Sequence, residues 1–201
     1  MTDAVHLIPA TSAAGGPWGG AHAQARTIAS QARNDGSDSV LWRALDLDID
    51  GDGACPTADG LDCILMLVEG GPLHWVKKRT AQTTRLDAGS RLYFAAEAPC
   101  AVQAVEAPAR LFLLQLLRKQ AHGCVDLRSR AQNLPMRAGE TLLHCARGRC
   151  QLRLPAHLGG PRELQAGDTL RITLAREPAF VLPFEPGDDR SRLIDARIHR
   201  Y

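Results

Sequence analysis

The segments 86-LDAGSRLYFAAEAPCAV-102 and 164-LQAGDTLRITLAREPAFV-181 are two versions of one pattern, and this pattern decides the fold. In both segments an Ala-Gly pair precedes an alternating apolar run, and a proline precedes the next run. Matched residues lie 77, 78 and 79 positions apart, in the pairs Gly71 and Gly148, Gly89 and Gly167, and Pro99 and Pro178. Such a nearly constant offset indicates that a β-unit of this length is duplicated within the chain.

Short apolar or alternating runs, bounded by Gly, Pro, Asp or charged residues, are typical of β-strands and occur along the whole chain. They are 40-VLWRALDLDI-49, 61-LDCILMLV-68, 91-RLYF-94, 100-CAVQAV-105, 111-LFLLQLL-117, 141-TLLHCA-146, 150-CQLRL-154, 169-TLRITL-174, 179-AFVLP-183 and 192-RLIDARI-198. The repeated unit resembles the cupin fold. We therefore expect an all-β bicupin: two cupin-like β-barrel or sandwich repeats, residues 1–120 and 121–201, packed as one compact unit.

The composition argues against several classes of partner. The 24 basic and 22 acidic residues are well mixed and leave a net charge of +2, so no basic surface for nucleic acid or for a membrane is expected. The N-terminal residues lack the pattern of a signal peptide, and no apolar run is long enough to cross a bilayer. We therefore expect a cytoplasmic protein whose six cysteines stay reduced.

The run 46-DLDIDGDG-53 resembles a calcium-binding loop, but the resemblance fails at two places. If Asp46 is the first ligand, the twelfth position, which should be a bidentate Glu, is Thr57. The preceding residues alternate, so that Leu45, Leu47 and Ile49 share one face of a strand. The aspartates are then expected on the opposite, solvated face.

Other metal and catalytic patterns are also missing from the sequence. Cupin metal centres use several histidines and a carboxylate, whereas the first repeat offers only His74 at the expected place and the second repeat offers none. No local context for a nucleophile can be recognised either. We therefore expect no metal, no cofactor and no assignable catalytic residue.

Four segments carry a family resemblance. The segment 17-PWGGAHAQARTIAS-30 resembles the opening motif of the HutD/Ves family, P-W-K-N-G-G-G-x-T-x-E-I-A. The runs 42-WRALDLDIDGDGACPTADGLDCILMLVEGG-71, 94-FAAEAP-99 and 108-PARLFLLQLLR-118 are similar to three further motifs of that family, in the same order and spacing. The resemblance implies a bicupin. It also implies a small ligand related to histidine breakdown, with no established catalytic mechanism.

Several polar residues of the family's motifs are replaced in this chain. The family's Lys and Asn are Gly19 and Gly20, its Glu is Thr27, and Leu111 and Leu113 replace an Asp and an Asn. We therefore expect a less polar pocket, which does not hold the family's polar ligand in the same way. The ligand-binding candidates are Trp18, Arg26, Arg43, Asp62, Glu97 and Arg110.

Arg43 carries the strongest physical argument among these candidates. It should share its strand face with the apolar Leu45 and Leu47, and a buried arginine is costly unless it is paired. Arg43 is therefore expected to reach a carboxylate such as Asp62 or Glu97, or to meet an anionic ligand. A structural ion pair or a surface position at the mouth of the fold is the alternative.

The first functional expectation is a non-enzymatic, small-molecule-binding or regulatory protein whose ligand is anionic or derived from an amino acid. One alternative is a metal-independent cupin enzyme of the isomerase or hydrolase type. Another is a structural protein with a vestigial cavity. Edge strands could also pair two chains into a homodimer.

Overall fold

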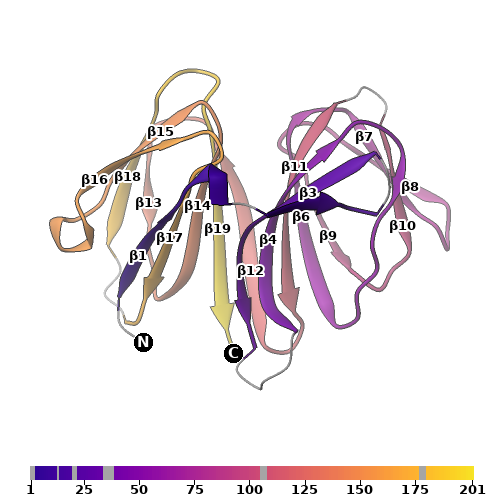
Figure 1. Ribbon diagram of the computed structural model, residues 1–201, viewed down its shortest axis with the longest axis horizontal. Helices are drawn as coiled ribbons and strands as arrows, with labels where there is room; N and C mark the ends of the chain where they lie inside the picture. Colours follow the sequence, from indigo (N-terminus) through magenta and orange to yellow (C-terminus); the bar gives the residue numbers. More distant parts are fainter. Residues whose placement is uncertain (1–2, 13, 20–21, 34–38, 105–107, 177–179) are drawn as a thin grey trace. The chain divides into compact units, whose positions relative to one another are not determined.

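The computed structural model describes residues 3–12, 14–19, 22–33, 39–104, 108–176 and 180–201, and these residues form an all-β fold (Figure 1). Residue contacts divide the chain into two compact units. The first unit contains residues 13–122 and Tyr201, and the second contains residues 1–12 and 123–200. Within the described residues there is no helix that is long and apolar enough to cross a membrane.

Two antiparallel sheets build the first unit. The larger sheet has the order β2 (Ala14–Pro17), β3 (Ala23–Ala32), β4 (Val40–Ile49), β11 (Ala109–Leu117), β6 (Leu61–Gly70) and β9 (Arg91–Ala95). The smaller sheet has the order β5 (Gly53–Ala54), β10 (Cys100–Ala104), β7 (Leu73–Lys77) and β8 (Gln82–Leu86). Leu47 and Leu113 of the larger sheet and Trp75 and Val102 of the smaller sheet belong to one buried cluster, so the core lies between the two sheets.

The second unit has the same construction. Its larger sheet has the order β1 (Ala4–Ile8), β17 (Thr169–Leu174), β14 (Gly139–Arg147), β19 (Arg192–Arg200) and β12 (Ala121–Arg128). Its smaller sheet has the order β13 (Gln132–Pro135), β18 (Val181–Pro186), β15 (Arg149–Arg153) and β16 (Pro161–Gln165). Leu143 and Leu193 pack with Leu152 and Phe184 in the buried cluster between these sheets.

The hydrogen-bonded sheets of the described residues are open, so no closed barrel is seen in either unit. The sequence is compatible with either a barrel or a sandwich, and the observed arrangement is a two-sheet sandwich. Antiparallel sheets with one apolar face are stable in this form because each sheet buries its face against the other.

The strand order of the two units corresponds. The order β9-β6-β11-β4 in the first unit matches β17-β14-β19-β12 in the second, and β8-β7-β10-β5 matches β16-β15-β18-β13. Both Ala-Gly turns are held by the same bond: Gly89 N donates to Leu67 O and Gly167 N donates to Cys145 O, each at 2.7 Å. Gly70, rather than the expected Gly71, lies 78 positions before Gly148, and both have a positive φ, 77° and 70°. Pro178 lies outside the described residues.

The first strand, β1, pairs with β17 and therefore belongs to the second unit, as Figure 1 shows. The following turn is held against the Ala-Gly turn of that unit, because Ala10 N donates to Asp168 Oδ1 at 3.1 Å. The grouping differs in this respect from the expected division into residues 1–120 and 121–201.

Candidate functional site

The six candidate residues fall into three pairs within the first unit. The first pair, Arg26 and Arg110, holds the buried carboxylate of Asp46. Arg26 Nη2 and Arg110 Nη2 each lie 2.5 Å from Asp46 Oδ2, and Arg110 Nε donates to Oδ1 at 3.0 Å. The hydrogen bonds to Asp46 raise the pKa of the Arg110 guanidinium. Arg26 and Arg110 are thus engaged in a structural ion-pair cluster.

This cluster corrects the interpretation of the acidic run. The strand alternates as expected, and Leu45, Leu47 and Ile49 belong to the buried cluster between the sheets. Asp48 and Asp50 are exposed, as expected for the solvated face, but Asp46 is only 4% exposed. The opposite face of β4 is therefore buried at Asp46, and two arginines compensate its charge.

The second pair, Asp62 and Glu97, is bound by Arg118, a residue that the sequence analysis did not select. Arg118 Nε donates to Asp62 Oδ1 at 2.7 Å, and its Nη1 and Nη2 donate to the two Glu97 oxygens at 3.1 and 2.9 Å. Glu97 also accepts a bond from Gly60 N at 2.8 Å. These bonds, the Arg118 bonds first, lower the pKa of Glu97 to about 2. The group ties the turn at Gly60 to the ends of β9 and β11.

The third pair, Trp18 and Arg43, lines a hollow of about 350 Å³ at one end of the first unit. Its other lining residues are Gly15, Gly16, Pro17, Ala25, Thr27, Leu45 and Pro56. Among the described residues, neither the Trp18 indole nor the Thr27 hydroxyl has a hydrogen-bond partner. The hollow therefore combines an aromatic wall with hydrogen-bonding groups that remain available.

Gly19 lets the chain pass closely beside this hollow. Its φ is +70°, and a Cβ at this position would lie 1.9 Å from the carbonyl oxygen of Ala54. Only glycine fits here, because other residues would meet both the left-handed backbone conformation and this clash. Gly19 thereby keeps Trp18 next to Pro56, on the wall of the hollow. Gly20, the other glycine of this motif, lies outside the described residues.

The expectation that Arg43 reaches Asp62 or Glu97 is wrong, since both of these carboxylates bind Arg118. Arg43 instead donates from Nε and Nη2 to one oxygen, Gln115 Oε1, at 3.0 and 2.6 Å. Gln115 in turn donates from Nε2 to Cys63 Sγ at 3.8 Å, and burial raises the pKa of that thiol to about 12. No carboxylate of the described residues pairs with Arg43.

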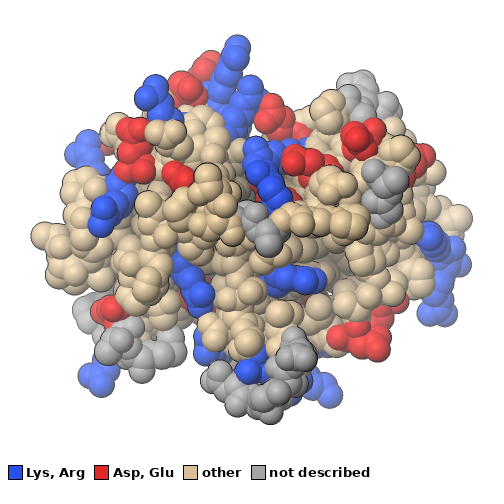
Figure 2. All heavy atoms as spheres, viewed as in Figure 1, with Lys and Arg blue, Asp and Glu red and all other residues tan. Residues whose placement is uncertain are grey.

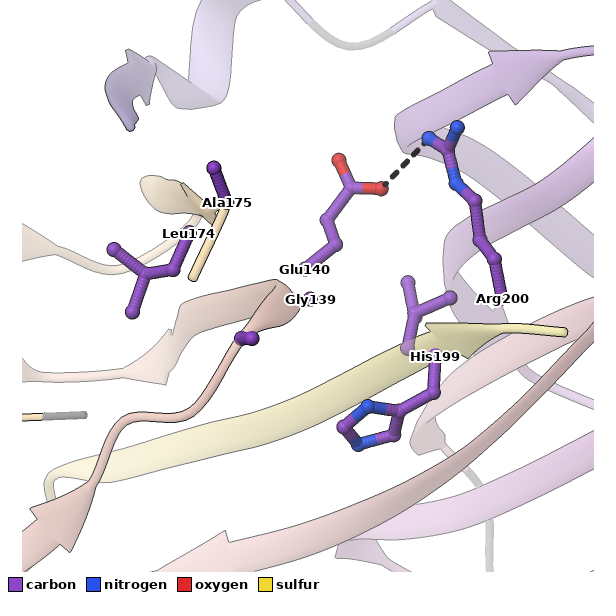
Figure 3. A pocket seen from close by; sticks show the side chains of 8 residues that line it. Gly139, Glu140, Leu174, Ala175, His199 and Arg200 are labelled. Atoms are coloured by element: carbon purple, nitrogen blue, oxygen red, sulfur yellow. Dashed lines mark ion pairs between the residues drawn. The ribbon is translucent and has the colours of Figure 1, made fainter. Parts of the chain in front are cut away.

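The second unit has two adjoining hollows at the end where β14 begins and β19 ends. One, of about 260 Å³, is lined by Gly139, Glu140, Ala175 and Arg200 among others. Figure 3 shows the Glu140 carboxylate pointing toward Arg200, at 3.7 Å, while the His199 ring points away from this pair. The other hollow, of about 150 Å³, shares Ala138, Glu140 and His199 with the first.

Charges of both signs are interspersed over the face that Figure 2 shows. Among the residues that the structure describes, no three His, Cys, Asp or Glu side chains are grouped as a metal site would require. None of the six cysteines forms a disulfide, and only Cys124 is not buried. The carboxylates of Asp46, Asp62 and Glu97 in the first unit are each paired with arginines.

A family model, HutD, matches residues 10–185. The chain belongs to the HutD family. Solved structures share the fold: HutD from Pseudomonas fluorescens SBW25 is 16% identical, with a TM-score of 0.80 over 98% of this chain and 100% of that chain. A conserved protein of unknown function from Pseudomonas aeruginosa PAO1 is 18% identical, with a TM-score of 0.78 over 98% and 99%.

A more distant neighbour of this HutD-family chain is the protein Ylba from E. coli, which is 10% identical, with a TM-score of 0.67 over 98% of this chain and 91% of that chain. The neighbours are cupin-like, and the all-β class expected from the sequence is confirmed. No curated protein matches the chain.

Proposed function

We propose that this HutD-family protein is a bicupin that binds a small anionic metabolite without transforming it, with Arg43 of the first unit as the anchor. The bicupin part of the proposal is supported by the corresponding strand orders of the two units and by their equivalent Ala-Gly turns. The binding part is carried by one observation: Arg43 lines a hollow, while the one side chain of the described residues that it bonds is a neutral amide.

An anion would complete the surroundings of Arg43. A guanidinium offers five N–H donors, and Gln115 Oε1 accepts from only two nitrogens. A partly buried positive charge is stabilised when a carboxylate or phosphate approaches with bidentate geometry. The Thr27 hydroxyl and the Trp18 indole N–H line the same hollow and supply further donors, so a carboxylate is the ligand group that fits best.

The size and the walls of the hollow favour a small metabolite with one charged end. Its volume of about 350 Å³ is near the lower bound of ~300 Å³ for pockets that hold drug-sized ligands. Trp18, Leu45 and Pro56 offer apolar contacts beside the arginine. Arg26, Arg110, Asp62 and Glu97 are occupied by ion pairs, which favours a structural role for these four candidates.

Isothermal titration with a panel of small carboxylates, including urocanate and formiminoglutamate, tests this proposal. We expect at least one carboxylate to bind, with affinity falling about tenfold or more in Arg43→Gln because a charge-assisted pair is lost. Arg85→Gln, on the exposed pair of Arg85 with Asp87, is the matched control and should bind as the wild type does. Unchanged affinity in Arg43→Gln would refute the assignment. A folded protein that binds no member of the panel would favour the vestigial cavity instead.

A further inference from the structure

We propose a second anion site in the second unit, in the hollow lined by Thr141, Arg137 and Arg197. This hollow measures about 150 Å³ and is also lined by Cys124, Ala138, Glu140 and His199. It is formed by a different set of strands from the Arg43 hollow and belongs entirely to residues of the second unit. The proposal therefore goes beyond the proposed function and does not depend on it.

The register of the sheets places two of the lining residues beside each other on neighbouring strands of the second unit. On β14 and β19, Thr141 is the register partner of Arg197. On the matching strands β6 and β11, where β6 residues lie 78 positions before those of β14, the corresponding pair is Cys63 and Gln115. The place that holds a thiol and an amide in the first unit thus carries a hydroxyl and a guanidinium in the second.

Several donors at this hollow have no acceptor. Thr141 is 6% exposed, and its hydroxyl forms no hydrogen bond with any described residue. Arg137 has neither an ion-pair partner nor a hydrogen-bond partner in the described part of the chain. Arg197 donates from Nε and Nη2 to Asp195 at 3.1 and 2.7 Å, which leaves its Nη1 available. Hydrogen-bond donors that line one hollow and lack acceptors can bind the oxygens of an anion.

The carboxylates near the hollow are already compensated and would not repel an anion. Asp195 is fully buried and is bound by both Arg197 and Arg128. Asp126 is paired with Arg128 at 2.9 Å. Glu140 is hydrogen-bonded to Arg171 and lies 3.7 Å from Arg200. Arg137 thus remains as a positive charge without a counterion among the described residues.

The volume restricts the ligand to a compact oxyanion. About 150 Å³ is well below the ~300 Å³ at which pockets take drug-sized molecules. A short carboxylate and inorganic phosphate share the required chemistry, since both present two or more oxygens to a guanidinium and a hydroxyl. Acetate and inorganic phosphate are therefore the two probes, and their comparison distinguishes the carboxylate from the phosphate source.

Cys124 supplies a readout that is specific to this hollow. It lines the hollow and is the one cysteine of the six that is not buried. Iodoacetamide, which is uncharged and does not compete as an anion, should alkylate Cys124 first, as peptide mass spectrometry can verify. We expect acetate, phosphate or both, at tens of millimolar and constant ionic strength set with chloride, to slow this alkylation in a saturable way.

Variants decide whether the protection comes from the proposed donors. Thr141→Val keeps the side-chain shape and removes the hydroxyl, and Arg137→Gln removes an exposed charge without touching the core. In the double variant the anion concentration for half-protection should rise on the order of tenfold. Arg43→Gln, which changes the first unit only, should leave the protection unchanged.

Two outcomes would overturn the second site: alkylation rates that neither anion changes in the wild type, or equal protection in the double variant. If Thr141→Val disturbs folding, as near-ultraviolet circular dichroism would reveal, Arg137→Gln alone decides. Protection by acetate but not phosphate identifies a carboxylate site, and the reverse identifies a phosphate site. Because the readout is local to Cys124, failure of this site is distinguishable from failure of the Arg43 proposal.

Discussion

Arg43 and Gln115 are joined by two hydrogen bonds to a single amide oxygen, at 3.0 and 2.6 Å. The amide fixes the direction of the guanidinium but leaves its charge uncompensated. A carboxylate at position 115 would provide direction and compensation together. The neutral partner is therefore the feature that makes an external anion favourable at this place.

Gln115→Glu should accordingly abolish anion binding while keeping the fold. The new carboxylate would form a bidentate pair with Arg43, so we expect an affinity for carboxylates at least tenfold lower and an unchanged or raised melting temperature. Gln115→Met is the matched control because it removes the amide and leaves Arg43 charged; it should retain more binding than Gln115→Glu. Calorimetry and thermal unfolding measure both. If the Glu variant bound carboxylates as tightly as the wild type, Arg43 would not be the anchor.

Asp46 and Asp48 provide a second comparison, because they lie two residues apart on one strand face and differ in burial. Asp46→Asn removes the charge between two arginines, and we expect the free energy of unfolding to fall by about 2 kcal/mol. Breaking a fully buried ion pair costs ~3–5 kcal/mol. The loss is smaller here because Arg26 and Arg110 are partly solvated. Asp48→Asn, on an exposed side chain, should change it by less than about 0.5 kcal/mol. Urea unfolding measures both values, and equal effects would contradict the role assigned to Asp46.

The same two residues show how far the sequence could lead. The alternation of β4, the all-β class and the HutD family could be predicted, because strand periodicity and motif spacing are local properties. The partners of Asp46 could not, since Arg26 and Arg110 come from two other strands and only the register of the sheet brings them together.

Arg118 was missed for the same reason. Its two carboxylates, Asp62 and Glu97, were selected from motifs, but nothing local connects either one with the end of β11. For Gln115 a signal did exist: it is the one polar residue in the apolar run from Leu111 to Leu117, on the inward face of its strand. An isolated polar residue at such a position marks a place where the core contains a specific polar contact.

Glu97 should titrate with a pKa of about 2, because Arg118 and Gly60 N stabilise its charged form. A lowered pKa in the folded state means that this pairing stabilises the protein above the ordinary pKa of about 4.5. That contribution is lost as the pH falls from about 4.5 toward 2. Carbon-detected NMR of the glutamate carboxyl groups measures the titration directly.

Arg118→Gln is the control for this titration. With the guanidinium removed, the pKa of Glu97 should return most of the way toward its ordinary value, since the Arg118 bond is the largest cause of the shift. The pH dependence of stability between about 2 and 4.5 should weaken accordingly. A Glu97 that still titrated near 2 in this variant would assign the shift to the backbone donors instead.

The two Ala-Gly turns allow a last comparison, between Gly89 and Gly167. Both have a φ near +90°, 87° and 94°, so alanine at either position costs about 1–2 kcal/mol in backbone strain. At Gly89 an added Cβ meets no atom within 4 Å, whereas at Gly167 it would lie 2.6 Å from Ala10 Cβ. Gly167→Ala should therefore destabilise the protein by about 1 kcal/mol more than Gly89→Ala.

The extra cost should be local to the turn that follows β1. Hydrogen exchange of the Ala10 amide, which donates to Asp168 Oδ1, should accelerate in Gly167→Ala and stay unchanged in Gly89→Ala. If both variants lost the same free energy and left the Ala10 amide equally protected, the residues after β1 would not be packed on this turn. In that case the pairing of β1 with β17 would be the main remaining support for assigning residues 1–12 to the second unit.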